Sequence, residues 1–347
     1  MIAIFFLVLL LSIAALNHPP VQTKVVQKVS GIVADKIGFP VNIGYVNLKW
    51  FDILLLDKVE VIDFKGNQMI YIHQLSVDFN VSALLNDSDI NLDQVTIEGA
   101  NVNLIRNTED GDLNMNLFIK NLRSLASSRS PSANKKTPVF SIDDIFLKNL
   151  YFSLNDPQED SIGNSFDYYH FEVFNINAEI KDLKVIADTF EIDVQKMTGY
   201  NKVNDLMVHN LKTFFRVSES SMEFTQLDLA VGNSLIKDSI IFLYNEIADL
   251  NHFNDSVQIV ANLDNTKIHS KDLALFAPVL KPYDDNYVIS GLFDGKIGKF
   301  TMRDFKLNFG INSSLEGIVS FDGLPNFEES FIEARLNNSS IHTFDIR

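Results

Sequence analysis

The chain has 347 residues, of which 46% are hydrophobic and 21% charged, and its formal net charge is −16 at pH 7. A surface this acidic repels phosphate backbones, which argues against a nucleic-acid partner. Cysteine is absent, so disulfide frameworks, cysteine-ligated zinc and thiol catalysis are excluded. The hydrophobic content is ordinary for a folded protein and too high for a disordered one.

The first residues form the most apolar segment of the chain. Residues 2–16 carry no charge, and Ser12 is their one polar side chain, so membrane insertion is favoured. As a helix they span about 22 Å, which is short of a hydrocarbon core of roughly 30 Å. We expect residues 1–18 to be a retained transmembrane anchor. The alternatives are a signal peptide cleaved near Ser12-Ile13-Ala14 and a buried helix of a soluble protein.

Residues 19–39 are predicted to form a short amphipathic helix. Pro19 and Pro20 suit its first turn, and Gly38-Phe39-Pro40 ends it. Apolar residues recur between them at helical spacing, namely Val21, Val25, Val29, Ile32, Val33 and Ile37. We expect this helix to pack on the end of a sheet; lying in the membrane interface is the alternative.

From residue 40 onward, apolar and polar residues alternate, which predicts strands with one dry and one wet face. The clearest apolar series are Leu75, Val77 and Phe79; Phe190, Ile192 and Val194; and Phe305, Leu307 and Phe309. Helical patches are predicted only near residues 243–250 and 271–280. Residues 124–137, which are rich in Ser and Lys, are predicted to be a flexible loop between a first β region (40–123) and a second one (138–347).

A weak internal repeat underlies this pattern. Residues 92–97 align with residues 142–147, and residues 56–61 open a third copy, so the copies are irregularly spaced. The repeat predicts similar strands laid side by side in an extending sheet. Its equivalent apolar positions are Val59 and Val61, Val95 and Ile97, and Ile145 and Leu147, while Glu60, Thr96 and Phe146 fall on the opposite face.

No motif in the sequence supports catalysis. The seven histidines are isolated, without metal-binding spacing. Residues 291–296 faintly resemble a phosphate-binding loop, but Ile297 stands where a Ser or Thr should bind magnesium. Residues 87–98 resemble a calcium loop that carries Leu92 where the turn requires glycine. We therefore expect no enzyme activity, no metal, no catalytic residue and no cofactor.

The chain resembles the AsmA-like family, and within it the TamB branch, the inner-membrane subunit of the translocation and assembly module. The residues that carry the resemblance are Pro19-Pro20-Val21-Gln22 after the anchor, residues 38–46, residues 54–66, and Gly291, Gly295, Gly310, Gly317 and Gly323 among alternating apolar residues. Two features depart from the family: no basic residues precede the anchor, and the long C-terminal β region is missing. We therefore expect the chain to be the N-terminal portion of a longer protein.

The resemblance implies a mainly β fold, an elongated U-shaped sheet with an open apolar groove that carries phospholipid between the inner and outer membranes of a Gram-negative envelope. It implies a single-pass inner-membrane protein, anchored through residues 2–16, with most of the chain in the periplasm. The groove candidates are the repeat and strand residues named above: Val59, Val61, Leu75, Val77, Phe79, Val95, Ile97, Ile145, Leu147, Phe190, Ile192, Val194, Phe305, Leu307 and Phe309.

Alternative readings stay open at this point. The apolar faces could pack on each other as a closed sandwich core. The function could be that of an assembly scaffold for outer-membrane barrel proteins, docking to an outer-membrane barrel of the TamA type through the missing C-terminal part. A third hypothesis is a secreted β-sandwich binding module whose signal peptide is cleaved.

Overall fold

The computed structural model describes residues 38–49, 52–78, 90–107, 113–116, 139–163, 165–186, 189–323 and 329–345. The predicted anchor, the predicted amphipathic helix up to residue 37 and the predicted loop at 124–137 lie outside these ranges. Within them, no helix has the length and apolar character needed to cross a membrane.

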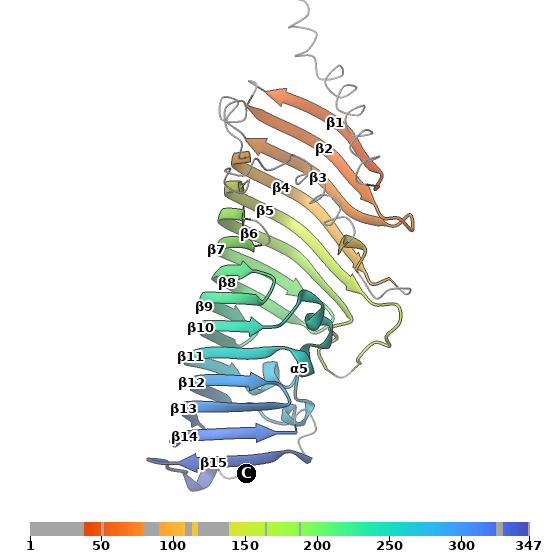
Figure 1. Ribbon diagram of the computed structural model, residues 1–347. Helices are drawn as coiled ribbons and strands as arrows, with labels where there is room; N and C mark the ends of the chain where they lie inside the picture. The colour runs from red at the N-terminus through yellow and green to blue at the C-terminus, as the bar shows by residue number, and fades with distance from the viewer. Residues whose placement is uncertain are drawn as a thin grey trace, which may run out of the picture. The chain divides into compact units, whose positions relative to one another are not determined.

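The described residues form one open sheet of fifteen strands, so the prediction of a mainly β fold is confirmed (Figure 1). The strands are β1 Val41–Lys49, β2 Ile53–Ile62, β3 Gln68–Asp78, β4 Ile90–Ile105, β5 Val139–Asn155, β6 His170–Ile186, β7 Thr189–Asn201, β8 Leu206–Val217, β9 Ser221–Val231, β10 Ser234–Leu243, β11 Gln258–His269, β12 Asn286–Lys296, β13 Lys299–Phe309, β14 Ser313–Asp322 and β15 Phe331–Leu336.

Among the described residues, the helical segments are short, and residues 114–116 after β4 are also helical. The labelled helical elements follow. They are η1 Ile247–His252, α5 Phe253–Ser256, α6 Ser270–Leu273, η2 Pro278–Leu280 and η4 Thr343–Asp345. The first four overlap or adjoin the helical patches predicted near residues 243–250 and 271–280.

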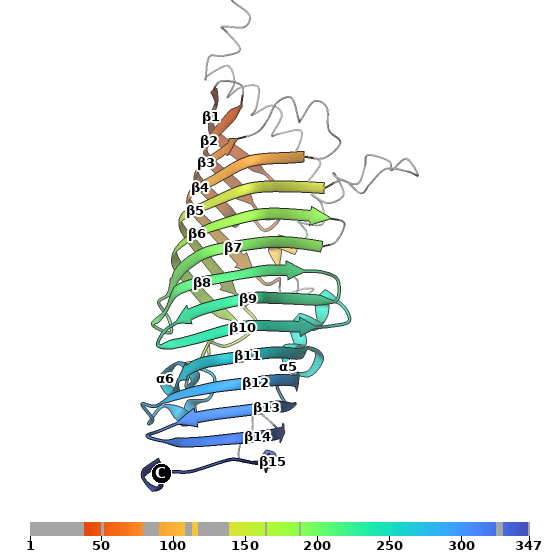
Figure 2. The same ribbon diagram turned by 90° about the vertical axis from the view of Figure 1, so that its left-hand side faces the viewer.

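The order of the strands in the sheet is their order in the chain, and successive strands lie side by side in both views (Figure 2). The chain divides into two compact units. Unit 1 comprises residues up to 161 together with 167–179, which include β1–β5 and the first part of β6. Unit 2 comprises residues 162–166 and those from 180 onward, which include the rest of β6 and β7–β15.

Strands β4 and β5 form a parallel pair, which needs a long crossover connection rather than a hairpin. Their register pairs Leu92 with Ile142 and Val95 with Ile145, and it keeps the same offset from Ile90 to Ile105. This is the offset at which residues 92–97 align with residues 142–147 in the sequence. The internal repeat therefore predicts both the adjacency of these strands and their register.

The third copy of the repeat does not follow the same rule. The register from β2 through β3 to β4 aligns Leu54 with Val77 and Val95, whereas Val59 is level with Ala100. The predicted equivalence of Val59 with Val95 is therefore wrong as a statement about neighbouring positions. A strand of opposite direction separates β2 from β4, so similarity along the sequence does not fix their register.

A left-handed residue recurs inside many of the strands, although β3, β7 and β8 show none. These residues are Lys58 in β2, Gly99 in β4, Asn149 in β5 and Asn175 in β6, then Gln226 in β9, Asp238 in β10, Asn265 in β11, Gly291 in β12, Asp304 in β13 and Gly317 in β14. In unit 2 the strand registers shift at the same places, as β-bulges do. We call this line of positions the bulge line. Most of its residues are Gly, Asn or Asp, which tolerate positive φ at the lowest cost.

The bulge line interrupts the two-residue alternation without exchanging the faces of the sheet. In β2, the consecutive polar residues Asp57 and Lys58 separate Leu56 from Val59. The apolar residues on either side are thus three positions apart instead of two. The pairing of β2 with β1 and β3 keeps one register across Lys58, so no extra residue is inserted there. The left-handed conformation of Lys58 (φ 55°) turns the strand so that both apolar segments stay on one face.

Asp63 holds the turn between β2 and β3. Its side chain is 3% exposed, and its Oδ1 accepts hydrogen bonds from the backbone N–H groups of Lys65 (2.9 Å) and Asn67 (2.8 Å). The Nδ2 of Asn114 donates to its Oδ2 at 3.3 Å, which ties the turn to the segment after β4. Burial by itself raises the pKa of the Asp63 carboxyl, but the hydrogen bonds from Asn67, Asn114 and Lys65 outweigh it and lower the pKa below its ordinary value.

We expect Asp63→Ala to lower the free energy of unfolding by about 2 kcal/mol at neutral pH, because buried donors lose their acceptor. Since the folded pKa is depressed, the ionised carboxylate stabilises the fold above the reference value of 3.8, and this contribution is lost as pH falls through the folded pKa. Urea denaturation at neutral pH and well below 3.8 should show the gap between wild type and variant closing. Asp143→Ala, at an exposed position, is the control. A gap that does not change with pH would contradict the assignment.

Gly317 tests the bulge line. Its φ is +150°, and an added Cβ would overlap the carbonyl oxygen of Arg335 and lie 3.0 Å from Cα of Leu336. We expect Gly317→Ala to cost about 3 kcal/mol of unfolding free energy, measured by chemical denaturation. Gly66→Ala is the matched control: its φ is +87° with no atom within 4 Å, so it should cost about 1 kcal/mol. Equal effects at the two sites would show that close packing at the bulge line is unimportant.

Candidate functional site: the apolar face of the sheet

Two unbroken rows of apolar residues cross unit 2 from β7 to β15. The first row is Ile192, Phe215, Phe224, Ile240, Ala261, Phe293, Met302, Val319 and Ala334. The second row is Phe190, Val217, Met222, Phe242, Ile259, Gly295, Phe300, Phe321 and Ile332. Residues paired across strands point to the same side of a sheet, so both rows lie on one face, which we call the apolar face.

The row between them points to the opposite side and is mostly polar. Its members are Glu191, Arg216, Glu223, Ile241, Val260, Asp294, Thr301, Ser320 and Glu333. Unit 2 therefore has a dry and a wet face over nine successive strands.

Unit 1 also has an apolar face, although its opposite face includes the apolar residues Leu55 and Phe146. On one side of the bulge line, the register aligns Val46, Leu56, Leu75, Ile97 and Leu147, and beside them Leu54, Val77, Val95 and Ile145. On the other side it aligns Val41, Val61, Ile70, Val102 and Phe152, and beside them Ile43, Val59, Ile72 and Ala100. The row Asn47, Leu55, Ser76, Thr96 and Phe146 faces the opposite way.

All groove candidates within the described residues fall on the apolar face of their unit, and Phe79 lies outside those residues. The structure brings Leu75, Ile97 and Leu147 into one row, and Val77, Val95 and Ile145 into the next. Val59 and Val61 lie on the same face but across the bulge line from Val95. Phe305, Leu307 and Phe309 likewise lie across it from Phe300 and Met302 on the same strand.

The apolar face is only partly covered. Val59, Val61, Val95, Ile145 and Val194 are buried, whereas the larger candidates Leu75, Ile97, Leu147, Phe190, Ile192, Phe305, Leu307 and Phe309 are half-buried, as is Val77. Among the described residues, the large apolar side chains with less than 2% exposure are Phe39, Met69, Val46 and Val257. A closed sandwich would bury its large inward side chains far more completely.

Phenylalanine rings line this face in unit 2. Phe190, Phe215, Phe224, Phe242 and Phe253 follow one another from β7 to α5 with centroid separations of 6.4, 4.9, 6.0 and 5.1 Å. A second series joins Phe293, Phe300 and Phe321 at 4.4 and 4.9 Å. Most of these rings are absent from the sequence-based candidates. Phe215 follows another Phe, and Gly291 and Gly295 flank Phe293, so neither strand shows plain alternation.

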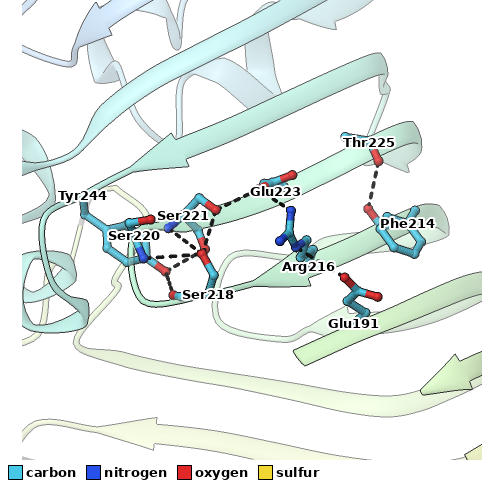
Figure 3. A network of polar contacts seen from close by, with 9 residues as sticks. All are labelled: Glu191, Phe214, Arg216, Ser218, Ser220, Ser221, Glu223, Thr225 and Tyr244. Carbon is cyan, nitrogen blue, oxygen red and sulfur yellow. Dashed lines mark hydrogen bonds and ion pairs between the residues drawn. The ribbon is translucent and has the colours of Figure 1, made fainter. Parts of the chain in front are cut away.

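The polar face of unit 2 is held by ion pairs and hydrogen bonds (Figure 3). Arg216 on β8 lies between Glu191 on β7 (Nε–Oε1, 3.4 Å) and Glu223 on β9 (NH1–Oε1, 3.6 Å). The Oγ of Ser221 donates to Oε1 of Glu223 at 2.7 Å. These partly exposed contacts contribute little energy each, but they set which side chains face water.

Tyr244 fixes the neighbouring β8–β9 turn. Its hydroxyl lies 2.9 Å from the carbonyl oxygen of Ser218 and 2.8 Å from that of Ser221, both of which can accept its single proton. Burial, reinforced by the charge of Glu223, raises the pKa of the Tyr244 hydroxyl, so it stays a neutral donor.

The described residues contain no group of three or more histidine or acidic side chains placed to hold a metal ion. The partly exposed apolar rows present a surface to which apolar groups can bind.

We expect Phe224→Ala to lower the free energy of unfolding by about 1–2 kcal/mol, because the ring is only half-buried; a fully buried Phe costs about 3–5 kcal/mol. A double-mutant cycle between Phe215→Ala and Phe224→Ala, measured by denaturation, should give a coupling of about 0.5–1.5 kcal/mol. Phe214 lies on the opposite face of β8, so a cycle between Phe214→Ala and Phe224→Ala should give almost no coupling energy. A loss typical of a sealed core would contradict an open face.

Comparisons with known proteins leave the family open. No family model matches the sequence, and no curated protein matches it. The structure alone supports the description of the fold and of the apolar face. Membership of the AsmA-like family stays a proposal that rests on sequence motifs.

Proposed function

We propose that the chain is part of a bridge-like lipid carrier of the AsmA-like family, TamB branch, in which the apolar face lines an open groove for the acyl chains of phospholipids. The proposal includes an inner-membrane anchor at residues 2–16 and a periplasmic location for the strands. The observation that carries it is the continuity of the apolar rows across successive strands in each unit, with most of their larger side chains only half-buried.

A conduit needs a surface that never interrupts the path of an acyl chain. In unit 2 the two apolar rows contain no charged residue from β7 to β15, and glycine is their least apolar member. Bulges bend the strands that carry them, so the segments on either side of the bulge line suit the two walls of a groove.

The energetics fit transport rather than storage. Burial stabilises each methylene by roughly 0.8 kcal/mol, so a sixteen-carbon chain gains on the order of 10 kcal/mol on leaving water for the groove. Relative to a bilayer the gain is near zero, so lipid enters without being trapped. The direction of lipid transport must then be set by another source of free energy.

Ile97→Asp and Thr96→Asp form a matched pair of variants, since the two residues are neighbours in β4, are both half-buried and face opposite sides. Ile97→Asp places a carboxylate beside Leu75 and Leu147, which should break the apolar path at a cost of several kcal/mol to a passing acyl chain. We expect it to abolish phospholipid co-purification, measured by native mass spectrometry of the detergent-extracted full chain.

Thr96→Asp adds the same charge beside Ser76 on the polar face and should leave bound lipid unchanged. Thermal melting of both variants completes the test. If Ile97→Asp retains phospholipid, or if wild type carries none, the conduit is refuted. If Ile97→Asp unfolds the protein, this face is a closed core at β4.

A further inference from the structure

Unit 2 contains two consecutive copies of a four-strand module, β8–β11 followed by β12–β15. In β9, residues 226–232 read Gln-Leu-Asp-Leu-Ala-Val-Gly, and in β13, residues 304–310 read Asp-Phe-Lys-Leu-Asn-Phe-Gly. The first and last residues of each segment are left-handed, with φ of 53° and 54° in β9 and of 50° and 59° in β13. The two segments therefore share a backbone conformation as well as a sequence pattern.

The last strand of each copy confirms the repeat. Residues 259–272, in β11 and α6, read Ile-Val-Ala-Asn-Leu-Asp-Asn-Thr-Lys-Ile-His-Ser-Lys-Asp. Residues 332–345, in β15 and the segment after it, read Ile-Glu-Ala-Arg-Leu-Asn-Asn-Ser-Ser-Ile-His-Thr-Phe-Asp. Half of the positions are identical. Each copy thus ends in an aspartate at the same place.

The two aspartates make the same contact in their own copies. Oδ2 of Asp272 accepts a hydrogen bond from Oγ of Ser234 at the β9–β10 turn, at 2.6 Å. Oδ2 of Asp345 accepts one from Oγ of Ser313 at the β13–β14 turn, at 2.7 Å. The copies share sequence, conformation and contacts, so a place where they differ is not needed to build the sheet.

The copies differ in the connection between their third and fourth strands. The pairs that flank it are equivalent, since Leu243 pairs with Gln258 in the first copy and Asp322 pairs with Phe331 in the second. Eight residues join β14 to β15, whereas fourteen, residues 244–257, join β10 to β11. Eight residues are thus enough to connect such a pair of strands. The longer connection contains η1 and α5.

The longer connection is fixed at both ends and near its middle. The hydroxyl of Tyr244 reaches carbonyl oxygens of the β8–β9 turn, and Val257 is fully buried. In α5, the carbonyl oxygen of Asp255 accepts a hydrogen bond from Nζ of Lys296 at the end of β12. Both views show α5 at the end of β11 (Figures 1 and 2). The connection is therefore held beside the ends of β10–β12.

Phe253 brings this connection onto the apolar face. Its ring centroid lies 5.1 Å from that of Phe242, with an angle of 81° between the two rings. Phe242 belongs to the second apolar row, which places the ring of Phe253 on the same side of the sheet. Phe253 is half-buried, so part of its ring stays accessible. A ring held over an apolar surface in this way can cover a further apolar group that lies on that surface.

We propose that η1 and α5 cover the apolar face at the ends of β10–β12, and that Phe253 contacts the acyl chain of a phospholipid bound there. The proposal rests on the proposed lipid conduit and adds a residue that controls how long the lipid stays. On an open face, an acyl chain has protein on one side and water on the other. A cover that shields about two methylenes from water is enough to slow lipid release about tenfold.

Photocrosslinking tests the contact between Phe253 and lipid. The photoreactive amino acid p-benzoylphenylalanine replaces Phe253, Phe190 or Ile241 in the full chain, which is irradiated with vesicles of phosphatidylethanolamine and phosphatidylglycerol. Phe190 lies on the apolar face three strands away from β10, and Ile241 adjoins Phe242 but faces the opposite side. We expect lipid adducts, measured by mass spectrometry, at positions 253 and 190 and almost none at position 241.

The three positions separate failure of the cover from failure of the conduit. Adducts at position 190 without adducts at position 253 would overturn the cover and leave the conduit standing. The absence of adducts from both positions would refute the conduit and the cover with it. Equal adducts at positions 241 and 253 would show lipid contact that is not confined to the apolar face, which also overturns the cover.

Lipid release tests what the cover does. A fluorescent phosphatidylethanolamine bound to the full chain is transferred to acceptor vesicles, and thermal melting checks that each variant folds. Phe253→Ala should release lipid about tenfold faster than wild type. The same is expected when residues 245–256 are replaced by a Gly/Ser linker that gives the connection eight residues, as in the second copy. Ile247→Ala, in η1 and 54% exposed, is the control and should leave release unchanged.

Either variant can refute the cover. Release at the wild-type rate from a folded Phe253→Ala chain, or from the shortened chain, would overturn it although the conduit stands. If Phe253→Ala does not fold, the shortened chain decides the question, because it keeps both Tyr244 and Val257. Wild type that binds no lipid would instead refute the conduit.

Discussion

The register between neighbouring strands is the constraint on which this structure depends. Side chains alternate with a period of two, so a slip of one residue in any pairing would move a whole strand of Phe, Ile or Val from the apolar face to the polar one. In β7–β9, the register pairs apolar residues with apolar residues on one face, and it pairs Glu191 with Arg216 and Arg216 with Glu223 on the other. The ion pairs and the hydrogen bonds of Tyr244 then hold the polar side and its turns in that alignment.

The bulge line solves a second problem, since a long strand that is bent must not exchange its faces. In β2, the left-handed Lys58 and its polar neighbour Asp57 keep Leu56 and Val59 on the same face. The use of Asn, Asp and Gly at these positions follows from the backbone conformation rather than from any ligand. The backbone conformation inside these strands explains why glycine, asparagine and aspartate occur there. In the sequence alone, the same residues resemble turns or binding motifs.

Much of the sheet could be predicted from the sequence, for identifiable reasons. Plain alternation revealed the strands that carry Leu75 and Val77 or Phe190 and Ile192, and the match of residues 92–97 to residues 142–147 predicted the β4–β5 register. The bulge line could not be predicted, because one Asn or Asp inside a strand reads as a turn. The aromatic series through Phe215 and Phe293 was missed because doubled Phe and flanking glycines hide the period of two. The anchor, the lipid and the family stay predictions.

The parallel pairing of β4 with β5 has a consequence for how the chain reaches this structure. From β7 to β14, most strands pair with the next through short connections, so sheet growth there closes small loops and costs little chain entropy despite the all-β architecture. Joining β4 to β5 instead requires the chain between Ile105 and Val139 to be closed into a single large loop. Loop closure therefore costs more chain entropy at the β4–β5 junction than at the short turns of unit 2, and we expect this pairing to form later than those hairpins.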